Sequence, residues 1–165
     1  MKKYAVAAMV AAMVAILAGC NSKGVVTPLV SASYTVVNDT VGYLHTVDNA
    51  AIVSSIDALV GGAGALNTAI TLVAKYYPSQ EYIQKALVDS QKVLDALKAV
   101  QADPSQVAEK VAIVTDTLKQ VRGYLEQINT TLGLGIVFPE PKVLSDNADL
   151  NSAIQALENA IQKAK

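Results

Sequence analysis

The sequence has few of the residues that build metal sites, disulfides and catalytic centres. Its 165 residues include one cysteine, one histidine, one phenylalanine and no tryptophan. A single cysteine allows no intrachain disulfide, so the fold must be stable without one. A metal site needs several converging ligands, and His45 has no second histidine or any nearby cysteine to join it. The sequence therefore predicts no metal, no cofactor and no catalytic residue, and it favours a partly exposed His45 near a helix end.

The motifs of hydrolases and of phosphate-binding enzymes are missing as well. No serine lies in the Gly-x-Ser-x-Gly pattern of a nucleophile elbow. The glycine-rich stretch at 61–64, "GGAG", lacks the Lys-Ser/Thr that completes a phosphate-binding loop. The 13 basic residues form no run and are balanced by 14 acidic ones, which is unlike a nucleic-acid-binding protein. We therefore expect a non-enzymatic protein that binds no nucleic acid.

The residues before the only cysteine have the layout of a secretory leader. Lys2 and Lys3 make a short positive start, and residues 4–19, "YAVAAMVAAMVAILAG", carry no charge. A basic start followed by such an apolar run is typical of a signal peptide. The run is also slightly shorter than the roughly 20 apolar residues that span a membrane. Residues 1–19 are therefore predicted to be a signal peptide.

The end of this leader, Leu17-Ala18-Gly19-Cys20, resembles the lipobox of bacterial lipoproteins. The resemblance covers residues 1–20. It implies cleavage between Gly19 and Cys20, a diacylglyceryl group on the Cys20 thiol and a fatty acid, such as palmitate, on the new amino terminus. One acyl chain binds a membrane marginally, whereas two or more anchor a protein stably. A buried free thiol, the alternative reading of Cys20, makes little sense within a cleavable leader.

The residue after the cysteine bears on the location. In enterobacterial members of that family, Asp at this position tends to retain the protein in the inner membrane. Asn21 is not Asp, so the resemblance favours the outer membrane, facing the periplasm, over the inner membrane. The mature chain keeps all 14 acidic residues and 11 of the 13 basic ones, a net charge of −3. Residues 20–33, rich in Ser, Thr, Gly and Pro, are predicted to be the lipidated cysteine and an irregular tether.

Periodic apolar residues predict helices over the rest of the chain, residues 34–165. The strongest stripes have alternating spacings of four and three residues. They define helices near 49–77, 80–102, 104–132 and 147–165, after a weaker helical piece at 34–47. Prolines 78, 104, 139 and 141 divide the chain into hairpin-length pieces, which disfavours one long coiled coil. The predicted fold class is all-α, an up-and-down antiparallel bundle of about four helices on a flexible lipid-anchored tether.

Two features within the predicted bundle are candidate partner surfaces. Residues 58–74 are uncharged, and Gly61, Ala65 and Ala69 recur every four residues, so another helix can approach closely. This stretch is typical of a central bundle helix, although a membrane-inserted helix is an alternative. Tyrosines also flank the turn at Pro78, where they can form a recognition patch or seal the bundle end. These tyrosines are Tyr76, Tyr77 and Tyr82.

The sequence supports three functional hypotheses. The first is a lipid-anchored helical envelope protein that binds the membrane through Cys20 and holds a protein partner, or a second copy of itself, there. The second is a pilotin-like or chaperone-like lipoprotein whose groove takes up a helix of a secretion or envelope complex. The third, an envelope hydrolase or ligand carrier, is the least favoured because no acid/base or ligand constellation is visible.

Overall fold

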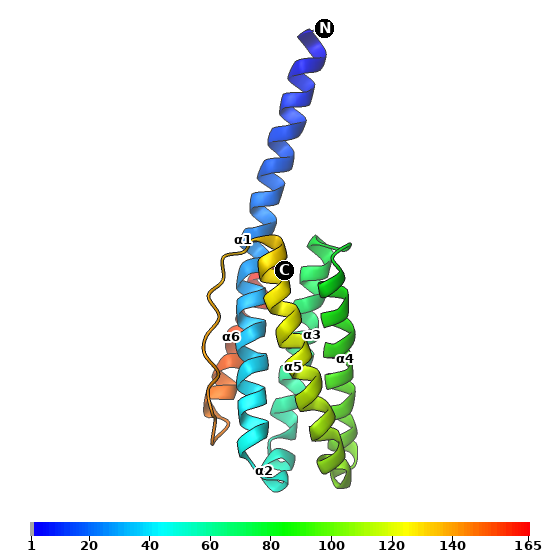
Figure 1. Ribbon diagram of the computed structural model, residues 1–165, viewed down its shortest axis with the longest axis vertical. Coiled ribbons are helices and arrows are strands. Elements are labelled where there is room, and N and C mark those ends of the chain that lie inside the picture. The colour runs from blue at the N-terminus through cyan, green and yellow to red at the C-terminus, as the bar shows by residue number, and fades with distance from the viewer. Residues whose placement is uncertain (1) are drawn as a thin grey trace.

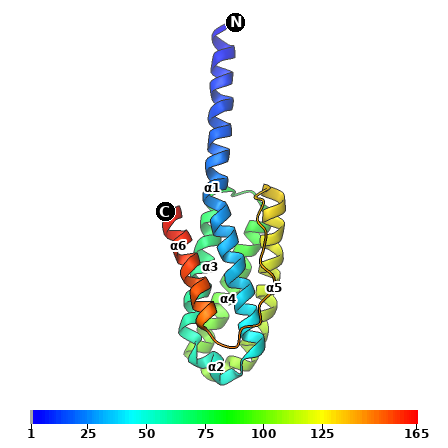
Figure 2. The same ribbon diagram turned by 90° about the vertical axis from the view of Figure 1, so that its left-hand side faces the viewer.

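The computed structural model describes the backbone of residues 2–165 and the side chains of residues 22–165. Over this part of the chain the protein is all-helical, which confirms the predicted fold class. The elements are α1 (Lys2–Thr46), α2 (Asn49–Ser54), α3 (Ile56–Tyr76), α4 (Glu81–Ala102), the 3₁₀ turn η1 (Pro104–Gln106), α5 (Val107–Leu132) and α6 (Ala148–Ala164). Figures 1 and 2 show a long bundle from one end of which α1 projects.

Four helices, α1, α3, α4 and α5, form a closed ring in which each helix packs against its two neighbours. Neighbours in the ring run antiparallel, as predicted, because short turns join α3 to α4 and α4 to α5. The last helix, α6, is not the fourth member of the ring. It lies outside, against α1 and α3, and runs parallel to α3 and α5. The extended connection after α5 returns along the bundle, and this return gives α6 its direction.

The predicted tether is wrong for residues 22–33, which belong to α1 and to the core. Val26, Leu29 and Val30 are fully buried there, so the packed core includes residues well before position 34. Pro28 and the Ser/Thr content gave the stretch an irregular appearance, but packing against three helices overrides such local preferences. An apolar spacing of three and four residues, starting at Val26, was the signal for this helix.

The stripes predicted near 49–77 and 104–132 lie in the core, where Leu118 and Leu125 are buried. The first of these helices is divided, however, because Ser55 ends α2 and α3 begins at Ile56. The Ser55 hydroxyl lies 2.8 Å from the Tyr43 hydroxyl, inside the bundle. The N-cap of α4 is Gln80, and the N-cap of α6 is Asn147.

Helix α5 ends in a glycine turn that starts the return segment. Gly133 has a φ of 59°, the left-handed conformation that glycine adopts without strain. The Leu134 amide donates to the Asn129 carbonyl at 3.1 Å, as in a Schellman motif. The Asn129 side chain then exchanges two 3.0 Å hydrogen bonds with the backbone of Ile136. These bonds direct the chain back along the bundle as an extended strap, residues 134–144.

The strap lies along α1 in a regular register. Going down α1, every fourth residue meets every second residue of the strap. Four helical residues advance about 6 Å and two extended residues about 6.6 Å, so the two repeats stay matched over the whole contact. The pairs are Tyr34 with Phe138, stacked at 3.9 Å, Asn38 with the Glu140 carbonyl at 3.4 Å, Gly42 with the Lys142 carbonyl, and Thr46 with the Leu144 carbonyl.

Gly42 gives a test of this register. A Cβ atom at Gly42 would lie 2.1 Å from the Lys142 carbonyl oxygen, so Gly42→Ala must displace the strap. We expect a loss of about 1–3 kcal/mol in the free energy of unfolding, measured by urea denaturation of the mature chain. Gly123→Ala is the control, because nothing lies within 4 Å of the added methyl group. This control should gain up to about 1 kcal/mol from helix propensity. An unchanged stability for Gly42→Ala would contradict the register.

Candidate functional site

The predicted Gly61, Ala65 and Ala69 ridge is largely occupied within the chain. Ala69 is 0 % exposed, so the prediction that it contacts a partner is wrong. Gly61 is exposed and Ala65 is half-buried, and both line a cleft of about 490 Å³ between α3 and α6. Helix α6 covers part of α3, and this cover explains in part why α3 has so few charged residues. Sequence alone could not assign α6 to this position, because the strap sets where α6 packs.

Among the residues whose side chains the structure describes, 22–165, α3 is long and apolar enough to cross a membrane. Within the bundle, α3 packs against α1, α4 and α6. Its Asn67 amide donates to the Ser90 hydroxyl of α4 at 3.2 Å, which satisfies a polar group that interrupts the α4 stripe. These contacts are those of a central bundle helix, the reading that the sequence favoured.

The three tyrosines at the Pro78 turn do not form one patch. Tyr77 turns toward α1, where its hydroxyl lies 3.1 Å from the Ser22 hydroxyl. Tyr82 turns toward α5, with its ring 6.5 Å from that of Tyr124. Tyr76 is 39 % exposed. Tyr77 and Tyr82 thus seal seams between helices, and only Tyr76 presents its side chain to the surroundings.

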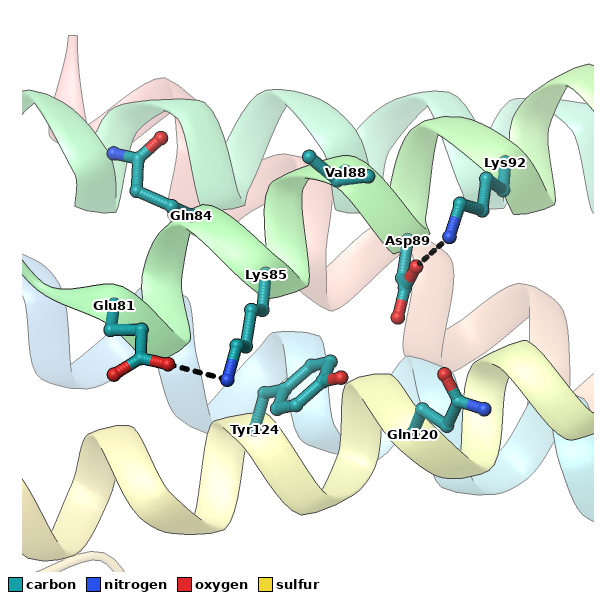
Figure 3. A pocket seen from close by; sticks show the side chains of 8 residues that line it. All are labelled: Glu81, Gln84, Lys85, Val88, Asp89, Lys92, Gln120 and Tyr124. Atoms are coloured by element: carbon teal, nitrogen blue, oxygen red, sulfur yellow. Dashed lines mark hydrogen bonds and ion pairs between the residues drawn. The ribbon is translucent and has the colours of Figure 1, made fainter.

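A groove that the sequence did not predict lies on the outer face of α4 and α5. Figure 3 shows its eight lining side chains, six from α4 and two, Gln120 and Tyr124, from α5. Its volume is about 420 Å³. Helix α6 packs against α1 and α3, and the strap lies along α1, so the residues that line this groove come from α4 and α5 alone. The lining residues are Glu81, Gln84, Lys85, Val88, Asp89, Lys92, Gln120 and Tyr124.

The charges of this α4/α5 groove are paired along α4. The Lys85 ammonium lies 2.5 Å from the Glu81 carboxylate, and the Lys92 ammonium lies 2.7 Å from that of Asp89. The hydrogen bond to Glu81 and its negative charge raise the pKa of Lys85. The groove therefore offers amide, hydroxyl and paired ionic groups to a ligand. Its lining contains no serine, cysteine or histidine.

Val88 stands out at the rim of this groove. It is 57 % exposed, and it also borders a second hollow, of about 490 Å³, between α3 and α4. Ile113, on α5, is 44 % exposed. Both residues lie off the core stripes of their helices, and an apolar residue off the stripe was the signal that could have found this surface. We refer to Val88, Ile113 and the groove together as the α4/α5 face.

The remaining predicted sites have simpler outcomes. His45 is exposed in the last turn of α1, as expected. Among the described side chains, no group of three or more His, Cys, Asp or Glu residues could hold a metal ion. Gly19 and Cys20 lie outside the residues whose side chains the structure describes. Cleavage and lipidation at these positions therefore stay predictions.

Comparison with known proteins adds no assignment to this geometry. No protein family, no curated protein and no solved structure matches the chain.

The seam among α1, the strap and α6 holds a buried carboxyl group. Asp39 of α1 is 7 % exposed and faces Lys142 of the strap and Asp149 of α6. Burial raises the pKa of Asp39, Lys142 opposes that increase, and Asp149 adds to it. Because the folded-state pKa exceeds the unfolded one, the native state loses stability as the pH rises through the folded-state pKa.

We therefore expect Asp39→Asn to stabilise the protein at pH 7 and to have little effect near about pH 3, below the ordinary Asp pKa, where the folded and the unfolded chain are both largely protonated at this position. The measurement is the free energy of unfolding in urea across this pH range. Asp116→Asn, on the exposed side of α5, is the control and should show no such pH-dependent gain. A destabilised Asp39→Asn protein at pH 7 would show that the charged carboxylate is favourable.

Proposed function

We propose that this chain is a lipid-anchored, non-enzymatic protein of the bacterial cell envelope that holds a partner protein at the membrane. The observation that carries the proposal is the leader. A basic start, an uncharged run and Leu17-Ala18-Gly19-Cys20 directly precede a folded bundle whose first described side chain is Ser22. The Asn21 that follows the cysteine supports an outer-membrane location facing the periplasm.

The α4/α5 face supports the partner-binding part of this proposal. Helix α6 packs elsewhere, against α1 and α3, and the α4/α5 face carries two exposed aliphatic side chains, Val88 and Ile113. Exposed apolar groups rimmed by polar ones are typical of protein interaction surfaces. The Gly61 and Ala65 cleft is a weaker candidate, because α6 already fills much of that side.

A second candidate function is the pilotin-like or chaperone-like one. The α4/α5 groove favours it, because a groove between two helices accepts the apolar face of a third helix. The paired lysines and carboxylates along α4 would then contact polar residues beside that face. The two candidates differ in the partner, an assembled envelope protein or a helix of a secretion subunit that is still in transit.

The anchor is tested by Cys20→Ser. Cells grown with a clickable fatty acid should label the wild-type protein, and Cys20→Ser should lose the label and keep residues 1–19, because the thiol that accepts the lipid is gone. Asn21→Ser is the control, since it changes the neighbouring residue and leaves the thiol in place. Equal labelling of the wild type and Cys20→Ser would refute lipidation at this residue.

The partner surface is tested by Val88→Glu. Chemical cross-linking in intact cells, followed by purification of the chain, should recover a partner with the wild type and lose it with Val88→Glu, because a charge in the interface would be desolvated. The matched control is Val137→Glu, on the strap, where the valine is 93 % exposed. Circular dichroism should show both variants to be helical. Recovery of the same partner with Val88→Glu would place the interface elsewhere.

A further inference from the structure

The two ends of the bundle carry opposite charge. At the end where α1 enters, exposed lysines lie on α1, α3 and α6: Lys23, Lys75, Lys163 and Lys165. Two carboxylates lie toward this end as well: that of Glu81, which is paired with Lys85, and that of Glu158, which lines the same cleft as Lys165. Toward the opposite end the basic groups are Lys98, Lys110, Lys142 and His45, and they are outnumbered by six exposed carboxylates: Asp48, Asp57, Asp103, Glu109, Asp146 and Asp149.

This asymmetry follows from the direction of the helices. Helices α3, α5 and α6 all begin at the acidic end and finish at the entry end (Figures 1 and 2). Carboxylates are favourable at helix N-termini and ammonium groups at C-termini. Asp57 and Asp149 accordingly occupy first turns, and Lys75 and Lys163 occupy last turns. Because the strap makes α6 parallel to α3, the terminal charges of these two helices add instead of cancelling, and α5 contributes Glu109 in its first turn.

The entry end is also the end joined to the leader. The Ser22 hydroxyl lies 3.1 Å from the Tyr77 hydroxyl, and one turn later Val26 is fully buried. Only Asn21 separates Cys20 from the folded bundle. Two residues span at most about 7 Å, so a lipid on Cys20 holds the entry end within that distance of the bilayer surface. A tether of two residues is too short to let the bundle rotate freely relative to the membrane.

We propose that the bundle stands upright on an anionic lipid surface, with its lysine-bearing entry end against the headgroups and its acidic end farthest away. This inference rests on the proposed lipid anchor. The lysines are attracted by the anionic headgroups, and the six carboxylates are repelled by them. Tyr76, the exposed tyrosine of this end, is of the residue type that favours the membrane–water interface. The α4/α5 face then stands perpendicular to the membrane, open to a partner from the side.

The orientation is measured with a fluorophore and a quenching lipid. The full lipidated chain carries one added cysteine, Ser79→Cys at the entry end or Ala102→Cys at the other end of α4. The two sites are about 33 Å apart, since α4 has 22 residues. Cys20 is the only native cysteine, and in the lipidated chain its sulfur carries the diacylglyceryl group, so the dye attaches only to the added cysteine. The probe is a vesicle of phosphatidylcholine and phosphatidylglycerol that contains a headgroup-nitroxide lipid.

We expect quenching several-fold stronger at position 79 than at position 102. Lys75→Glu combined with Lys163→Glu should reduce this ratio to its value on vesicles of phosphatidylcholine alone. Lys98→Glu combined with Lys119→Glu, an equal change of net charge away from the entry end, should leave the ratio unchanged. Equal quenching at both positions, in a chain that floats with the vesicles, would overturn the upright orientation alone. A chain that does not float would overturn the anchor and the orientation together.

Discussion

The burial of α1 is the constraint on which the rest of the structure depends. Between Val26 and Leu44 this helix is buried, and it packs against α3, α5, α6 and the strap. Helices α3, α5 and α6 therefore bury part of their apolar stripes on the surface that α1 supplies. A segment that looks irregular in composition thus becomes the central helix of the fold, because burying apolar area outweighs the weak local preferences of Ser, Thr and Pro28.

The strap links the packing on α1 to the distribution of charge between the two ends of the bundle. Its register on α1 is set by backbone groups and by small or flat side chains, such as Gly42 and the stacked Tyr34. By returning along the bundle, the strap makes α6 start at the same end as α3 and α5. The helix-terminal carboxylates and lysines therefore gather at opposite ends. A hairpin turn in place of the strap would have reversed α6 and weakened that separation.

This topology also decides which side of the ring is covered by other parts of the chain and which side is left open. Helix α6 covers α1 and α3, and the strap covers α1, so the groove of α4 and α5 is left open. The predicted ridge of Gly61, Ala65 and Ala69 falls on the covered side, and Ala69 is fully buried by the chain itself. An uncharged helix face signals that something packs on it, but it does not tell whether that neighbour belongs to the same chain.

The sequence by itself determined the helical class, the stripes of α3, α5 and α6, and the breaks at Pro78 and Pro104, because apolar periodicity and proline act over a few neighbouring residues. It also contains the lipobox-like leader, which is recognised from residues 1–20 alone, without knowledge of the fold. Only the tertiary structure decided that residues 22–33 are core, that α6 lies outside the ring and that Val88 borders a groove. These outcomes depend on contacts between residues about 100 positions apart, such as Asn38 with Glu140. Local patterns hold no information about such pairings, because they arise from packing and register.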